Sequence, residues 1–299
     1  AAKNHAHVTV LVDSNDYGRV LKEMRSSGGA VGESTRFTLA RKAFEHTARY
    51  DSAIAEYLGQ IREDGVAEPF PASLHLGLER AADMRYGENP HQRGAFYREP
   101  DVTGANVASA SQLQGKELSF NNVADFDAAF EAVKEFEEIA CVIVKHANPC
   151  GVAEAGDPLA AYRRAFDCDP ASAFGGLIAF NRNVDEATAR AILDQQFVEG
   201  VIAPGFEPQA LEVFGEKANV RILQTPSLSL PESSRLDYKR VRGGLLVQDQ
   251  DLALYDADQL KAVTQRQPTE AEWRELLFAW RGVKHVKSNA IVYAKDRTT

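Results

Sequence analysis

The pattern of apolar and polar positions divides the chain into a helical first part and an alternating second part. Residues 34–60 carry apolar side chains near helical spacing and predict one long helix. Residues 17–24 predict a shorter helix before it, and the β-branched run at 7–12 predicts a strand. Charges and two prolines mark residues 63–71 as a linker. We therefore expect residues 1–75 to form a first region that ends in this linker.

Strands and helices alternate after the linker. The continuous apolar run at 139–144 predicts a strand buried on both faces, followed by a turn at 148–151. Asp157 and Pro158 form a favourable helix start, with an acceptor at the cap and proline at the first helical position. Further strands are expected at 176–180, 201–203 and 220–223, and further helices at 184–196 and 210–213. This repetition predicts an α/β fold with a mixed, largely parallel sheet.

A second boundary is expected in the loop at 225–239, which is rich in Ser, Pro and charged residues. Beyond it, Thr269 and Glu272 form a capping box that opens a helix over 273–281, and residues 290–294 resemble a strand. Three regions follow from these changes: 1–75, 76–238 and 239–299. Because the chain begins at an alanine and stops just after the strand-like run, we expect it to be a segment of a longer protein.

Composition and charge exclude several classes of protein. The 44% hydrophobic and 26% charged residues are typical of a folded soluble chain rather than a disordered one. A net charge of −9 disfavours nucleic acid as a partner. No apolar run approaches the ~20 residues that cross a bilayer, and the start has no signal-peptide core, so we expect no membrane partner. Three cysteines without a C-x-x-C pair fit a cytoplasmic protein.

The strongest local signal for chemistry is Lys145 and His146, at the end of the predicted buried strand. Open α/β sheets bind ligands at the carboxyl ends of their strands. Histidine exchanges protons near neutral pH, and lysine supplies positive charge and hydrogen-bond donors. Since neighbouring strand residues point to opposite faces, both address one substrate only if the strand has ended or bent. The alternative is a solvated lysine and a structural histidine.

A second dense segment is the loop at 84–92, where Arg85 next to Tyr86 is suited to hold an anion and stack on a flat ring. Its structural alternative is a surface turn with an incidental arginine. Four further candidates are polar or glycine residues beside other predicted elements: Asn122, Gly175, Glu199 and Asn289. The alternative for each of them is an ordinary structural role in a helix cap, a turn or a strand end.

Several catalytic motifs are missing from the sequence. It contains no G-x-x-x-x-G-K-[ST] phosphate loop, no G-x-G-x-x-G fingerprint and no G-x-S-x-G nucleophile elbow. His146 is not followed by glutamate two residues later, and there is no P-C-x-x-C. A zinc nucleobase deaminase is therefore not supported, and no metal site is expected.

Seven blocks of sequence together resemble one family, the bifunctional 5-aminoimidazole-4-carboxamide ribonucleotide (AICAR) formyltransferase/IMP cyclohydrolase. The blocks are residues 1–5, 85–92, 113–122, 144–151, 172–176, 199–205 and 288–294. They span essentially the whole chain, and seven blocks in the same order as in the family are far harder to produce by chance than a single motif.

The resemblance implies a reaction and an architecture. The family transfers a formyl group from 10-formyltetrahydrofolate to the exocyclic amine of AICAR, and a separate amino-terminal domain closes formyl-AICAR to IMP. Its transformylase region consists of two cytidine-deaminase-like α/β lobes without zinc, with active sites at a homodimer interface. Residues 1–75 would then be the helical remainder of the cyclohydrolase domain, 76–238 the first lobe, and 239–299 the start of the second.

The resemblance also implies residue roles. His146 would transfer protons, with Lys145 as its electrostatic partner, and Lys3 would be the remaining cyclohydrolase residue. The substrate pocket would be lined by Arg85, Tyr86, Asn122, Gly175, Glu199 and Asn289. We expect the 299-residue segment alone to have little or no activity in either reaction. The alternatives are a non-catalytic nucleotide- or folate-binding module and a zinc-dependent deaminase on a related fold.

Overall fold

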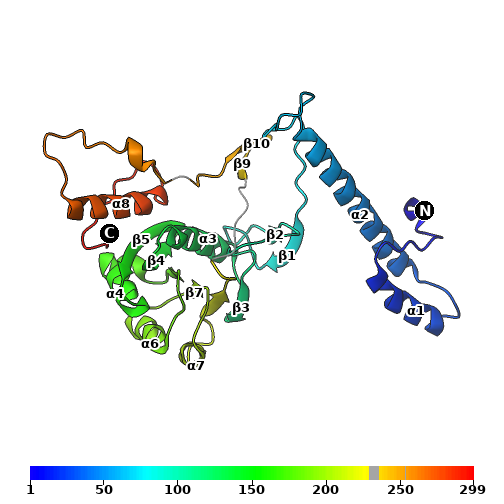
Figure 1. Cartoon of the computed structure of the whole chain (residues 1–299). Helices are drawn as coiled ribbons and strands as arrows, with labels where there is room; N and C mark the ends of the chain where they lie inside the picture. The colour runs from blue at the N-terminus through cyan, green and yellow to red at the C-terminus, as the bar shows by residue number, and fades with distance from the viewer. Residues whose placement is uncertain (229–235, 253) are drawn as a thin grey trace. The chain divides into compact units, whose positions relative to one another are not determined.

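The computed structural model describes residues 1–228, 236–252 and 254–299 (Figure 1). These residues form two compact units, Ala1–Glu79 and Arg80–Thr299, which are described separately. Residues 229–235 of the predicted boundary loop lie outside the described residues.

The first unit is helical. Helix α1 spans Tyr17–Ser26 and helix α2 spans Glu33–Gly59, which confirms both predicted helices. The Lys42 ammonium of α2 lies 2.5 Å from Asp13 Oδ2 and 2.7 Å from Asp16 Oδ2, and so fixes the turn before α1. The predicted strand at 7–12 is wrong, since these residues pair with no strand among the described ones. Their β-branched composition favours extended backbone, but a strand also requires a partner.

The second unit is built on a six-stranded sheet in the order β3-β8-β7-β6-β4-β5. The strands are β3 (Ser111–Gln114), β4 (Ile139–Lys145), β5 (Asn148–Ala155), β6 (Leu177–Phe180), β7 (Gly200–Ala203) and β8 (Arg221–Gln224). The predicted α/β class and mixed sheet are confirmed. The parallel part is smaller than predicted, because only β6–β7 and β7–β8 pair in parallel. The β4–β5, β4–β6 and β3–β8 pairs are antiparallel.

The predicted turn at 148–151 is wrong, because Asn148 already begins β5. Strands β4 and β5 form a hairpin whose two connecting residues, His146 and Ala147, have φ of 55° and 53°. Pro149 donates no hydrogen bond, which is tolerated because β5 lies at the edge of the sheet and the ladder is irregular between Ile143 and Val144. The Asn-Pro pair, typical of turns, therefore lies in an edge strand.

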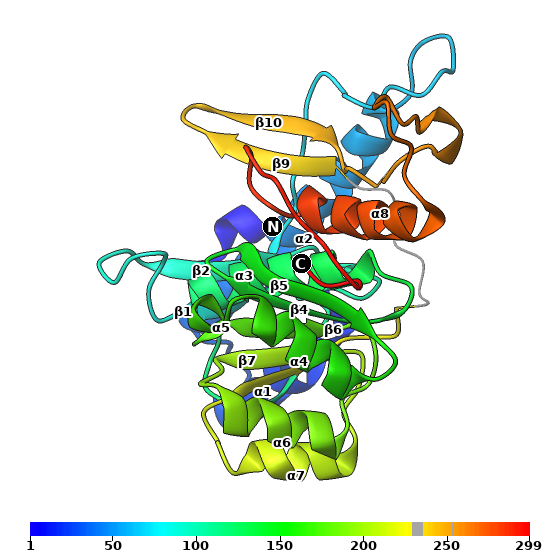
Figure 2. The ribbon, with the colours of Figure 1, turned by 90° about the vertical axis from the view of Figure 1, so that its left-hand side faces the viewer.

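Helices cover both faces of this sheet (Figure 2). Helix α3 (Phe120–Lys134) packs on the face that carries Ala140, Val142 and Val144. Helices α4 (Pro158–Cys168), α6 (Glu186–Gln195) and α7 (Pro208–Gly215) pack on the opposite face, and α5 (Pro170–Ala173) is a single turn before β6. Alternate residues of β4 are thus buried on opposite sides, as the continuous apolar run predicted.

The last helix is α8 (Glu270–Lys284), which begins at the predicted capping box of Thr269 and Glu272. Its buried Phe278 packs beside Phe136 with ring centroids 5.3 Å apart. The predicted strand at 290–294 is irregular instead, and the pairing occurs just after it: Glu154 N–H donates to Arg297 O at 3.0 Å on the edge of β5. Two small two-stranded sheets complete the unit: β1 (Glu79–Met84) with β2 (Gly94–Arg98), and β9 (Leu236–Val241) with β10 (Gly244–Asp249).

Candidate functional site

Three predicted site residues lie at one edge of the six-stranded sheet. Lys145 ends β4, Gly175 lies two positions before the start of β6, and Glu199 directly precedes β7. Because β4 runs antiparallel to β6, the carboxyl end of β4 lies at the same edge as the amino ends of β6 and β7. The candidate residues therefore lie at the carboxyl end of β4, as predicted, but at the amino ends of the parallel strands β6 and β7.

Lys145 and Gly175 are in direct contact. The half-buried Lys145 Nζ donates a hydrogen bond to Gly175 O at 2.7 Å. Gly175 has φ of 69°, and a Cβ at this position would stand 2.9 Å from Lys145 Nζ. The left-handed backbone favours glycine at this position, and a Cβ would displace the Lys145 ammonium from its present place. The contact directs the lysine head group to this sheet edge.

Glu199 and Asn122 are also in contact. Asn122 Nδ2 donates to Glu199 Oε2 at 3.2 Å, and its Oδ1 accepts from Ser119 N–H at 3.1 Å. Asn122 is only 6% exposed, so it is a helix-capping residue of α3 and a partner of Glu199 at the same time. The role of Asn122 in the helix cap therefore does not exclude a second role in the candidate site.

Arg221 belongs to this cluster and was missed from the sequence. Its NH1 donates to Glu199 Oε2 at 3.0 Å, and its Nε donates to Glu117 O at 3.2 Å. The guanidinium and the Asn122 amide thus donate to the same carboxylate oxygen, and the Arg221 side chain is 12% exposed. The only signal in the sequence is a charged residue inside the predicted strand 220–223.

His146 is exposed at the tip of the β4–β5 hairpin, directly after Lys145. The following residue, Ala147, donates its N–H to Asp125 Oδ1 at 2.6 Å. Asp125 lies on α3, three residues after Asn122. The strand has thus ended at His146, which is the condition that allows Lys145 and His146 to address one substrate.

Arg85 and Tyr86 follow β1 and lie against each other, with the guanidinium carbon 6.0 Å from the Tyr86 ring centroid. Their loop closes through a hydrogen bond from Gly87 N–H to Gln92 O at 2.7 Å. Asn121 Nδ2 of α3 donates to Glu88 O at 3.4 Å. The loop therefore lies next to the amino end of α3, where Asn122 contacts Glu199.

Asn289 is exposed in the irregular segment after α8. This segment is joined to the β4–β5 hairpin, because Lys287 N–H donates to Asn148 Oδ1 at 3.3 Å.

Two exposed aromatic rings at the same edge of the sheet were also missed from the sequence. Phe174 directly precedes Gly175, and Phe197 lies two residues before Glu199. Their ring centroids are 5.6 Å apart, and the two residues are 63% and 57% exposed.

Lys3 belongs to the first unit. It is exposed in a short 3₁₀ helix, Ala2–Asn4. The backbone that follows is fixed by Arg36, whose Nε donates to His5 O at 2.8 Å and whose NH2 donates to Ala6 O at 2.7 Å.

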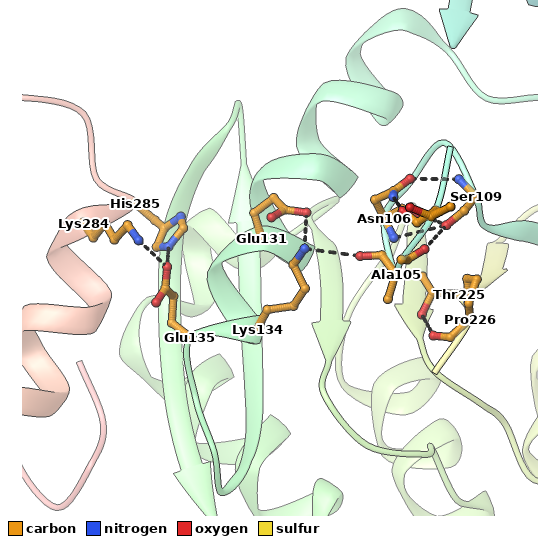
Figure 3. Close-up of polar contacts among 12 residues, drawn as sticks. Ala105, Asn106, Ser109, Glu131, Lys134, Glu135, Thr225, Pro226, Lys284 and His285 are labelled. Carbon is orange, nitrogen blue, oxygen red and sulfur yellow. Dashed lines mark hydrogen bonds and ion pairs between the residues drawn. The ribbon is translucent and has the colours of Figure 1, made fainter. Parts of the chain in front are cut away.

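A separate charged cluster lies at the other end of α3 and borders a cavity of about 370 Å³ (Figure 3). Glu135 Oε1 is 2.7 Å from Lys284 Nζ and 3.3 Å from His285 Nε2, and Lys134 Nζ is 2.7 Å from Glu131. The basic groups of this cavity are thus paired with carboxylates of α3. We interpret the cluster as the contact that holds the end of α8 against α3.

The Glu135 contact makes stability depend on pH. Burial raises the pKa of Glu135, but hydrogen bonds from His285 and Lys284 outweigh it and leave the pKa below its usual 4.5. The carboxylate therefore stabilises the fold above pH 4.5, and this contribution is lost as the pH falls through the lowered folded-state pKa. We predict that Glu135→Gln lowers the free energy of unfolding by about 1–3 kcal/mol at neutral pH.

Urea denaturation at a series of pH values checks this prediction. The difference between wild type and Glu135→Gln is expected to shrink below pH 4.5, and Glu138→Gln, at an exposed position three residues later, serves as the control. A difference that stays constant down to acid pH contradicts the assignment.

Two structural features are absent from the described ranges. No helix in them is long and apolar enough to cross a membrane. The same residues contain no group of three or more His, Cys, Asp or Glu side chains that are placed to hold a metal ion.

The cluster of Lys145, Gly175, Glu199 and Asn122 joins residues from four of the sequence blocks that resemble one family. The family model described as AICARFT/IMPCHase bienzyme matches residues 1–299, which is the whole chain. The chain therefore belongs to the AICARFT/IMPCHase bienzyme family of purine biosynthesis, whose name joins a formyltransferase and an IMP cyclohydrolase.

Proposed function

We propose that this chain carries a formyltransferase site that transfers a formyl group from 10-formyltetrahydrofolate to the exocyclic amine of AICAR. The product, formyl-AICAR, is then cyclised to IMP by the complete protein. The observation that carries the proposal is the contact of Lys145 with Gly175 at the sheet edge where Asn122 meets Glu199. Family membership across the whole chain supports the same reaction.

His146 is assigned the proton transfers. The AICAR amine is conjugated with its ring and carboxamide, so it is a weak nucleophile, and a base has to remove its proton as the bond to the formyl carbon forms. The exposed imidazole of His146 is suited to accept that proton near neutral pH. The departing folate nitrogen needs a proton, which the same imidazole returns.

Lys145 and Asn289 are assigned to the developing negative charge. The tetrahedral intermediate carries an oxyanion, which fixed hydrogen-bond donors stabilise. Lys145 uses one of its three N–H groups for Gly175 O, so the ammonium is held in place and keeps donors for the substrate. The side-chain amide of Asn289 is exposed and supplies a second donor.

The remaining residues are assigned to binding. Arg85 holds the nucleotide phosphate and Tyr86 stacks on a flat ring, while Asn122 and Glu199 offer polar groups to the nucleotide. The exposed pair of Phe174 and Phe197 provides an apolar surface for a second flat ring, such as that of the folate.

Further parts of the proposal concern the complete protein. Lys3 is assigned to the cyclohydrolase reaction. We also propose a homodimeric, cytoplasmic enzyme that uses no zinc and binds neither nucleic acid nor membrane. The isolated segment is expected to have little or no activity in either reaction.

The proposed reaction is tested with the complete protein, purified and incubated with AICAR and 10-formyltetrahydrofolate. We expect tetrahydrofolate and formyl-AICAR to form together, followed by IMP, which absorbance and chromatography detect. Binding of AICAR without turnover would point to a non-catalytic module, and stoichiometric zinc by metal analysis would point to a deaminase. Either result contradicts the proposal.

A further inference from the structure

The connection between β4 and β5 is conformationally unfavourable. Both of its residues, His146 and Ala147, have left-handed φ values of 55° and 53°. Two-residue hairpin turns with positive φ at both positions normally use asparagine, aspartate or glycine. A residue with a Cβ is strained in this conformation, because its Cβ comes too close to the following carbonyl oxygen. The local sequence therefore does not favour the turn that it forms.

The strand ladder pairs Lys145 with Asn148 directly beside the turn but is irregular a little further along. The register of β4 and β5 is irregular between Ile143 and Val144, and Val144 faces Pro149, which has no N–H to donate. Strand β5 is also the edge of the sheet, so no further strand of the sheet holds it from the other side. Another contact has to stabilise the turn.

That contact comes from α3. Ala147 N–H donates to Asp125 Oδ1 at 2.6 Å, and hydrogen bonds to a carboxylate are roughly twice as strong as neutral ones. Asp125 follows Asn122 by three residues, so the two side chains lie on the same face of α3. One helix face thus contacts both Glu199 and the His146–Ala147 turn.

We infer that Asp125 is a positioning residue for formyl transfer, which holds the His146–Ala147 turn in its left-handed conformation and so sets the direction of the His146 side chain. Asp125 contacts the backbone of the turn and acts through His146. The inference rests on the proposed function for its kinetic consequence. The hydrogen bond itself is testable without any activity.

The first readout is the backbone of the turn. In the complete protein, Asp125→Ala is expected to accelerate hydrogen exchange of the Ala147 amide, because its acceptor is lost. Asp125→Asn keeps an oxygen at the same position and gives a smaller acceleration, and this isosteric variant also serves if Asp125→Ala does not fold. Asp127→Ala, at an exposed position two residues later on α3, is the control and leaves the exchange unchanged.

The second readout is kinetic. We expect Asp125→Ala to lower kcat for formyl transfer about 10- to 100-fold with little change in KM for AICAR, because a small misplacement of a catalytic group has effects of this size. Asp125→Asn should recover most of this loss, and ring closure of formyl-AICAR should continue at the wild-type rate in both variants.

The outcomes separate the inference from the proposed function. Unchanged Ala147 exchange in Asp125→Ala overturns the inference, as does an Asn variant that is as slow in formyl transfer as the Ala variant. If the wild-type protein transfers no formyl group, the proposed function is refuted, and so is the role of Asp125 in catalysis. The hydrogen-exchange data still decide in that case whether Asp125 holds the turn.

Discussion

Replacement of His146 by alanine in the complete enzyme is expected to lower the rate of formyl transfer by about 100- to 10,000-fold, the usual contribution of a positioned acid–base group. The AICAR amine would then have to lose its proton without a base, and the folate nitrogen would have to leave without an acid. The side chain is exposed at a hairpin tip and is absent from the buried core, so its removal should leave the fold intact.

A folate-absorbance assay measures this effect, and the cyclisation of formyl-AICAR to IMP is followed in parallel. Cyclisation should proceed at the wild-type rate, because it is assigned to the region of Lys3. His75→Ala, at an exposed histidine outside the candidate site, is the matched control and should retain both activities. Equal turnover of His146→Ala and wild type would refute the assignment of His146.

Gly151→Ala is expected to lower the free energy of unfolding by about 3 kcal/mol or more, at or beyond the upper end for overpacked cores. Gly151 lies on β5, and a Cβ there would stand 1.9 Å from Ala165 O and 2.8 Å from Ala165 C of α4. These are backbone atoms of a packed helix, so no side-chain rotation relieves the contact.

Urea denaturation of the wild-type protein and Gly151→Ala, with Gly156→Ala as the control, tests this effect. Gly156 directly follows β5, and a Cβ there meets nothing within 4 Å. The control variant should therefore differ little from wild type. If Gly151→Ala and Gly156→Ala are equally stable, the close packing of α4 on β5 is wrong.

The elements that were predictable from the sequence are those with local signals. Helix α8 was located by the Thr269–Glu272 capping box and α4 by Asp157 and Pro158, because capping depends on residues three or four positions apart. Strand β4 was located by its continuous apolar run, which is typical of a strand covered on both faces.

The β4–β5 hairpin shows why local signals fail elsewhere. Asn148 and Pro149 are typical turn residues, whereas His146 and Ala147 are not, yet the turn lies at the second pair. The outcome depends on Asp125, which is 22 residues away from Ala147 and stabilises the left-handed conformation through a hydrogen bond. Contacts of this kind are set by the packing of α3 on the sheet and leave no periodic signal in the sequence.

The candidate site was predicted in part. Lys145, Asn122 and Glu199 were named from the sequence blocks, but Arg221 was not, although it donates to Glu199 at 3.0 Å. Asn122 and Glu199 are 77 residues apart in the chain, so only the topology of the sheet brings them together. The resemblance named candidate site residues, whereas the groups in contact with them became apparent only in the three-dimensional arrangement.

A crystal structure of the complete protein with AICAR bound would test the proposed site. We expect the exocyclic amine within hydrogen-bond reach of the His146 imidazole, roughly 2.6–3.2 Å away, with the Lys145 ammonium on the same side and the phosphate at Arg85. A nucleotide bound away from the β4–β5 hairpin, or Lys145 and His146 on opposite sides of the bound ring, would contradict it.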